Sequence, residues 1–211
     1  MRGTTWANRL VASTRIFVGF AFVPAGLKKV LAQPFTDPGL HGPFHDFLHA
    51  FHATGGFYRF VGALQLVTAV LLMTQRFAPV GALLATPILT TILAFCWSTK
   101  VYPTASVVTL MWLATLALVA WDRPWWRAVL TRDGEAPAGG ATIDDRSPIA
   151  LRAWERSGLT VLLMYLAVCV ATGGVYRPRG AAASSPAFYV FPAMLLVLVA
   201  TVFRDRAPSS R

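Results

Sequence analysis

All four histidines of the chain lie within one short stretch, residues 39–52, whose sequence is GLHGPFHDFLHAFH. They are His41, His45, His49 and His52. Imidazole nitrogens bind zinc, copper and haem iron, and two histidines four residues apart on a helix can share one metal ion. His45 and His49 are therefore the candidate metal ligands.

The alternative is that these histidines form the polar face of a helix at a membrane surface. Residues 43–53 have the pattern of a short amphipathic helix with a proline in its first turn, and phenylalanines lie opposite the histidines. His45 and His52 are separated by about 10.5 Å of helix rise, too far to converge easily on one ion with bonds of about 2 Å. Asp37, Asp46, His41 or a partner chain would have to complete a metal site, so both interpretations stay open.

A lysine inside an apolar segment is the second candidate for chemistry. Gly19 and Gly26 form a glycine stripe on the first apolar segment that is expected to face the bundle. Lys29 stands about one turn inside the end of this segment, about 60° around the helix from Gly26, whereas Lys28 lies about 160° away. Only Lys29 is therefore placed to face other helices. Such a cation either reaches out to lipid headgroups or anchors an anionic or carbonyl group of a ligand.

Gln65 and Thr90 are the expected neighbours of Lys29 in a ligand-binding site. Gln65 falls near the middle of the second long apolar segment, in a stripe of small and polar residues suited to close helix packing. It forms either a structural hydrogen bond between helices or a contact with a ligand. Thr90 is one of three threonines in the next segment, and no catalytic residue stands out.

Apolar helices must position these residues, and the composition of the chain indicates that it forms such helices. Of 211 residues, 55% are hydrophobic and 13% are charged, and the mean hydropathy is +0.55. A helix of about 20 apolar residues spans a bilayer. The predicted fold class is an all-α polytopic transmembrane bundle. Six spans are expected, near residues 16–33, 57–75, 77–97, 103–121, 157–174 and 187–203.

The formal net charge of +10 is explained by the distribution of the basic residues on the two sides of the membrane. With six crossings, most arginines fall on the side that carries both termini, as the positive-inside rule requires of cytoplasmic segments. We expect a multi-pass protein of the bacterial cytoplasmic (inner) membrane with both termini in the cytoplasm. Nucleic-acid binding is not expected, because the sequence has no basic patch with interleaved aromatic residues.

Other chemistries lack the residues they need. No predicted span contains a histidine, which disfavours a membrane cytochrome b, and carboxylates fall only in loops and at the termini, which disfavours a proton relay. Cys96 and Cys169 fall inside apolar segments and are expected to pack as small apolar residues.

Two stretches of the sequence resemble the DoxX family of small bacterial membrane proteins. The first, RIFVGFAFVPAGLKKVL, is similar to the family's first-helix pattern of Arg, Gly, Phe, Gly and Lys. The second, at 60–95, is similar to its second helix, basic turn and third helix. Where the family commonly has Glu followed by Gly-Gly, this chain has Gln65 followed by LVTAV. In the first stretch the matching residues are Arg15, Gly19, Phe22, Gly26 and Lys29.

The resemblance implies that residues 1–121 are a four-helix membrane unit. The outer helix 43–53 and the rest of the chain lie outside the shared pattern. From the sequence pattern, we expect residues 122–156 to be an arginine-rich cytoplasmic loop and 157–211 to be a C-terminal transmembrane hairpin with a short tail.

The resemblance also implies a function. The chain would be a subunit or accessory of a quinone-linked oxidoreductase. Our first hypothesis is that it holds a quinone-like lipid near Lys29 and Gln65 and serves a redox partner. Two alternatives stay open: a non-enzymatic scaffold or small-molecule carrier, and a membrane-embedded enzyme acting on an isoprenoid or lipid. The enzyme is the weaker alternative, because no carboxyl group is placed for acid catalysis.

Overall fold

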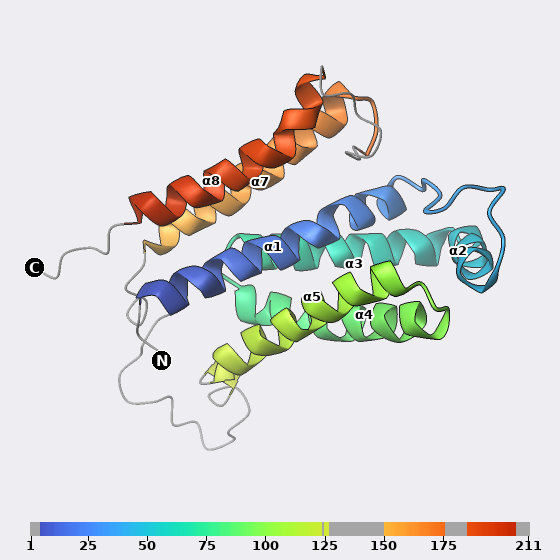
Figure 1. The fold of residues 1–211 in the computed structure, drawn as a ribbon, viewed down its shortest axis with the longest axis horizontal. Coiled ribbons are helices and arrows are strands. Elements are labelled where there is room, and N and C mark those ends of the chain that lie inside the picture. The colour runs from blue at the N-terminus through green and yellow to red at the C-terminus, as the bar shows by residue number, and fades with distance from the viewer. Residues whose placement is uncertain (1–4, 124, 127–149, 176–184, 206–211) are drawn as a thin grey trace, which may run out of the picture.

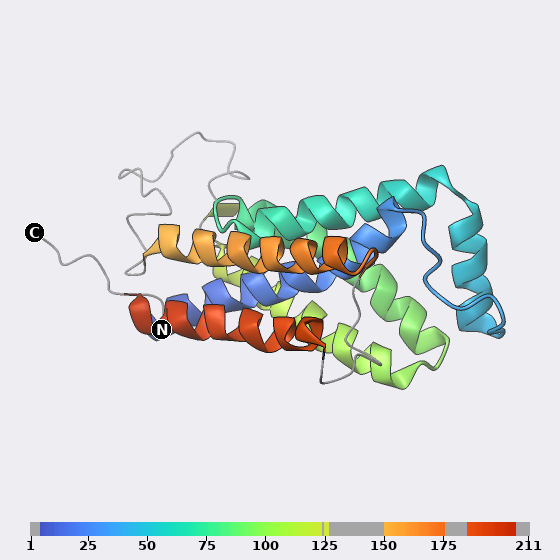
Figure 2. The same ribbon diagram turned by 90° about the horizontal axis from the view of Figure 1, so that it is seen from above.

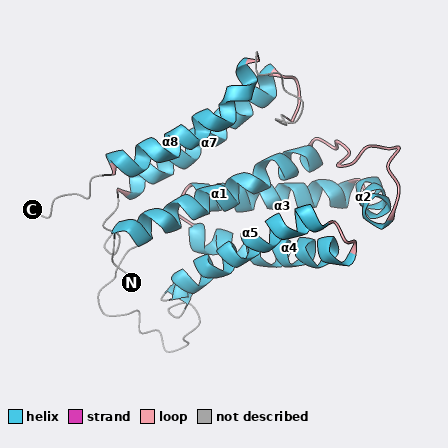
Figure 3. Ribbon diagram, viewed as in Figure 1, coloured by secondary structure: helices cyan, strands magenta, loops and turns pink. Residues whose placement is uncertain are grey.

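The computed structural model describes residues 5–123, 125–126, 150–175 and 185–205, and this part of the chain is helical with no strand (Figures 1 and 3). Six helices are long and apolar enough to cross a membrane, so the predicted all-α polytopic bundle is confirmed. The short helix is α2 (Pro43–Ala53), with the bounds predicted for the outer helix. The long helices are α1 (Thr5–Val30), α3 (Gly56–Met73), α4 (Ala78–Ser98), α5 (Tyr102–Trp121), α7 (Leu151–Ala171) and α8 (Val190–Arg204), the last preceded by the 3-10 turn η2 (Pro186–Tyr189).

Helix α1 is the centre of the bundle. It packs most extensively against α3, and it also contacts α5 on one side and α7 on the other (Figure 1). Helices α7 and α8 form a hairpin along α1. We call the end of the bundle that holds the start of α1 and the end of α8 the terminal end. The opposite end, which α2 crosses at a steep angle to the long helices in Figure 2, is the cap end.

The predicted glycine stripe of α1 allows α3 to approach closely. A Cβ atom added at Gly26 would lie 2.9 Å from the carbonyl oxygen of Gly62, and one added at Gly19 would lie 3.0 Å from that of Ala69. Both distances are shorter than ordinary carbon contacts, so the two backbones touch. Membrane helices use small residues in this way because lipid tails offer no hydrophobic drive toward helix association.

Large apolar side chains cover the outside of the bundle. In a water-soluble protein such an apolar surface would be a liability, whereas in hydrocarbon it is the expected lipid-facing surface. This observation agrees with the six apolar helices in placing the chain in a bilayer. Exposed examples on the long helices are Phe17, Val67, Leu83, Leu110, Leu163, Val170 and Leu196.

Helix α1 begins well before the predicted first span. The span was expected from about residue 16, after Arg9 and Arg15, whereas the helix begins at Thr5. Both arginines are paired inside the protein: Arg15 lies 2.8 Å from Asp122 and Arg9 lies 3.2 Å from Asp205. These pairs allow α1 to continue through two charged residues.

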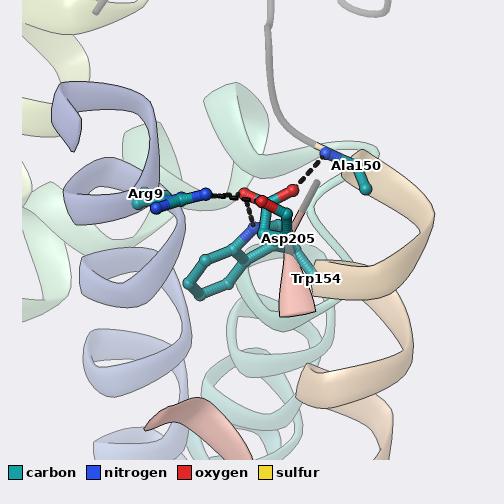
Figure 4. A network of polar contacts seen from close by, with 4 residues as sticks. All are labelled: Arg9, Ala150, Trp154 and Asp205. Atoms are coloured by element: carbon teal, nitrogen blue, oxygen red, sulfur yellow. Dashed lines mark hydrogen bonds and ion pairs between the residues drawn. The ribbon is translucent and has the colours of Figure 1, made fainter. Parts of the chain in front are cut away.

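Asp205 attaches the C-terminal hairpin to α1 at the terminal end (Figure 4). Its carboxylate accepts hydrogen bonds from the Arg9 guanidinium, from the backbone N–H of Ala150 at 2.7 Å and from the Trp154 indole at 3.2 Å. The Asp205 side chain is fully buried. Three donors thus stabilise one buried charge, and they join α1, α7 and the end of α8.

Helix α7 begins at Leu151, before the predicted start of the fifth span at residue 157, so the helix extends into the predicted loop 122–156. Residues 127–149, the centre of that loop, lie outside the described residues.

Candidate functional site

Lys29 lies in the last turn of α1 and points into the α1–α3 contact, as the helical geometry predicts. The residue is 7% exposed, although its neighbour Lys28 is only partly buried. The Lys29 ammonium donates to the carbonyl oxygen of Ala25 at 3.2 Å and to Oε1 of Gln65 at 3.1 Å. Lys28 donates instead to the carbonyl oxygen of Pro34 at 3.0 Å. The two adjacent lysines therefore have different surroundings.

Gln65 meets Lys29 because α3 presents a stripe of small and polar residues to α1. Gly62, Gln65, Thr68 and Ala69 are all buried, which confirms the predicted face of this helix. A Cβ atom at Gly62 would lie 2.5 Å from Cβ of Lys29, so the absence of a side chain there gives Lys29 its room. Gln65 itself is 2% exposed.

Two aromatic rings complete the surroundings of the Lys29 ammonium. The nitrogen lies 4.5 Å from the ring centroid of Phe35 and 5.9 Å from that of Tyr58. Ring faces carry partial negative charge and attract a cation, more strongly where water is excluded. The Tyr58 hydroxyl donates to the carbonyl oxygen of Gln33 at 2.8 Å, which fixes the ring beside the segment that carries Phe35.

Within the described ranges, no carboxylate pairs with Lys29. The ion pairs found there join Arg9 to Asp205, Arg15 to Asp122 and His41 to Asp46. A lysine ammonium has three N–H donors, and neutral oxygens accept two of them at this site. A buried cation without a counter-charge is costly, so an additional acceptor with negative charge would be favourable here. The arrangement is suited to a carbonyl, phenolate or other anionic oxygen.

Thr90 is not joined to this site by any contact that the structure shows. The residue is exposed, and its hydroxyl donates to the carbonyl oxygen of Thr86 at 2.8 Å. The same oxygen accepts a hydrogen bond from the indole N–H of Trp112 on α5 at 2.9 Å. These bonds give Thr90 a role in the contact between α4 and α5.

The histidines contact the segment 31–42, which connects α1 to α2. His49 Nε2 bonds to the carbonyl oxygen of Leu40 at 3.1 Å, and His52 Nε2 bonds to that of Ala32 at 3.0 Å. His45 Nδ1 bonds to the hydroxyl of Thr36. Three of the four imidazoles therefore bind different points of one segment.

A metal site at His45 and His49 stays a prediction. No group of three histidine, cysteine or acidic side chains is placed to hold an ion within the part of the chain that the structure describes. The two rings use one nitrogen each for the contacts with the segment, which leaves His45 Nε2 and His49 Nδ1 outside those contacts.

Sequence reasoning missed the two aromatic residues of the Lys29 site. A signal existed for Tyr58, which precedes Gly62 by four residues and Gln65 by seven and so shares their helix face. No local pattern identifies Phe35, because it lies outside any helix and reaches Lys29 only through the path of segment 31–42.

Comparison with models of known protein families, with curated proteins and with solved structures gives no match to this chain.

Proposed function

We propose that this chain is a DoxX-like inner-membrane protein that binds the polar head of a quinone-like lipid against Lys29 and Gln65, as an accessory of a quinone-linked oxidoreductase. The quinone carbonyl accepts a hydrogen bond from the Lys29 ammonium. On reduction the oxygen gains negative charge, and the ammonium stabilises that charge more strongly than it stabilises the neutral ring. The redox partner supplies the electrons.

One observation carries the proposal: Lys29 is buried, has no carboxylate partner among the described residues, and keeps a donor beyond its bonds to Ala25 and Gln65. A cation kept inside a membrane at this cost is a functional-site candidate by default. The rings of Phe35 and Tyr58 favour a flat aromatic or quinonoid group beside it.

The distribution of basic residues supports the proposed orientation. Helix ends and turns at the terminal end carry arginines, whereas those at the cap end carry fewer basic residues. Cytoplasmic loops of membrane proteins have this excess of arginine and lysine. The terminal end would then face the cytoplasm, and the Lys29 site would lie in the outer half of the bilayer. At the terminal end the described arginines are Arg9, Arg15, Arg76, Arg123, Arg152, Arg156 and Arg204.

A binding experiment with the two adjacent lysines tests the proposal. The wild-type chain, Lys29→Met and Lys28→Met are placed in lipid nanodiscs and titrated with a short-chain ubiquinone, with binding followed by tryptophan fluorescence. A hydrogen bond to a charged group contributes about 1.5–3 kcal/mol, so Lys29→Met should weaken binding about 10- to 100-fold. Lys28→Met should not weaken binding, because the Lys28 ammonium bonds to the carbonyl oxygen of Pro34 rather than lying in the α1–α3 contact beside Gln65.

If the wild type and Lys29→Met bind the quinone with equal affinity, Lys29 does not contact the bound quinone. If the wild type binds no quinone and purifies instead with a stoichiometric partner protein, the non-enzymatic scaffold replaces the quinone-binding function. Circular dichroism of each variant checks that the helices are retained.

A further inference from the structure

Helix α2 and segment 31–42 form a cover across the cap end of the bundle (Figure 2). Aromatic contacts hold α2 in place. The ring of Phe47 lies 4.5 Å from that of Phe95 on α4, and the ring of Phe51 lies 5.0 Å from that of Tyr58 on α3. Because α2 contacts both α3 and α4, it forms a base for the segment that precedes it.

Segment 31–42 lies between that base and Lys29. The ring of Phe35 in this segment lies 4.5 Å from the Lys29 ammonium, and the carbonyl oxygen of Gln33 accepts a hydrogen bond from the Tyr58 hydroxyl. The segment is irregular and none of its residues is buried, so packing alone gives it little stability. Specific hydrogen bonds must therefore decide how firmly it stays in place.

The α2 histidines supply three of these bonds, and Lys28 and Tyr58 supply two more, to the carbonyl oxygens of Pro34 and Gln33. The three contact points, Ala32, Thr36 and Leu40, lie on both sides of Phe35 along the chain. Two of them are backbone carbonyls, which accept a hydrogen from a ring nitrogen irrespective of the side chain at that position. His41 differs: its side chain is 80% exposed and lies 3.6 Å from Asp46. The spacing of histidines that first indicated a metal site thus places three imidazoles along segment 31–42.

We propose that His45, His49 and His52 are positioning residues for the Lys29 site. They hold segment 31–42 closed with Phe35 over the ammonium, and a ligand reaches Lys29 from the cap end when the segment lifts. The role of this cover as a gate for a quinone-like lipid rests on the proposed function. The proposal that the segment is closed and controls access to position 29 does not depend on that function.

Backbone hydrogen exchange of residues 31–42 tests the closed position. The wild type is compared in nanodiscs with His49→Ala, His52→Ala and His41→Ala. Loss of one hydrogen bond should raise the open population, and with it the exchange rate, about 5- to 10-fold. His41→Ala should exchange like the wild type. His49→Gln keeps an N–H donor for the Leu40 carbonyl and should restore slow exchange, which a merely space-filling role of His49 would not require.

Labelling of a cysteine at position 29 tests access without any ligand. In a chain with Cys96 and Cys169 replaced by alanine, Lys29→Cys is treated with a membrane-impermeant thiosulfonate reagent. Adding His49→Ala or His52→Ala should raise the labelling rate by a factor similar to the rise in exchange, and adding His41→Ala should leave it unchanged. Continued slow exchange within residues 43–53 shows that α2 stays folded in each variant.

The outcomes separate this inference from the proposed function. Faster exchange and faster labelling in the His49 and His52 variants support the cover, whether or not the protein binds quinone. Unchanged exchange, or faster exchange with unchanged labelling, overturns it, even if Lys29→Met abolishes quinone binding. Failure of the wild type to bind quinone, with the labelling result as expected, overturns the proposed function alone.

Discussion

Gly62→Ala should separate Lys29 from Gln65, the two polar residues of the candidate site. The added Cβ would lie 2.5 Å from Cβ of Lys29 and 2.8 Å from the carbonyl oxygen of Gly26. Ordinary carbon contacts begin near 3.4 Å, so α1 must move away from α3 by about 0.9 Å at this level. The bond from Lys29 to Gln65, now 3.1 Å, would lengthen toward about 4 Å, beyond hydrogen-bonding range.

The expected loss is about 1–3 kcal/mol of unfolding free energy, the usual cost of overpacking, together with weaker quinone binding. The unfolding free energy can be measured by titrating the protein in mixed micelles with a denaturing detergent. Gly56→Ala is the matched control on the same helix, because a Cβ there meets open space. If Gly62→Ala and Gly56→Ala have equal stability and equal quinone affinity, the close α1–α3 contact does not form the site.

Two further predictions concern the attachment of the C-terminal hairpin. Asp205→Asn should cost about 1.5–3 kcal/mol, because Arg9 loses its charged partner while staying largely buried, and hydrogen exchange in α7 and α8 should rise while exchange in α3 stays slow. Gly158→Ala should loosen the same hairpin, since the new Cβ would lie 2.1 Å from the backbone oxygen of Met73. Gly174→Ala is the control, because a Cβ there meets open space, and the amides of α7 and α8 should exchange at the wild-type rate in this variant. If these amides also exchange at the wild-type rate in Gly158→Ala, the packing of α7 against Met73 is contradicted.

Helical periodicity predicted the parts of the fold that depend on local sequence. It distinguished Lys29 from Lys28, since adjacent residues on a helix differ by about 100° and only one of them can face α3. It also gave the bounds of α2, because Pro43 fits the first turn of a helix and the phenylalanines share one face. The buried stripe around Gln65 followed from the same geometry.

Contacts between residues distant in sequence could not be predicted in this way. Arg9 and Asp205 are 196 residues apart, and nothing near Arg9 in the sequence indicates a partner that keeps it inside a helix. The pattern of Thr90 could not show that its face of α4 meets Trp112 of α5. The histidines were expected to face either water or a metal, because the pattern of one helix does not show that segment 31–42 folds back onto it.

Photo-crosslinking with a quinone that carries a photoreactive group on its ring can locate the quinone-binding site. After irradiation of the wild-type protein in nanodiscs, peptide mass spectrometry identifies the labelled residues. A quinone bound at Lys29 should give adducts confined to residues 25–35 and 58–65, around the ammonium, and these adducts should be lost in Lys29→Met but not in Lys28→Met. Adducts spread over the lipid-facing surfaces, or confined to α7 and α8, would contradict a quinone-binding site at Lys29.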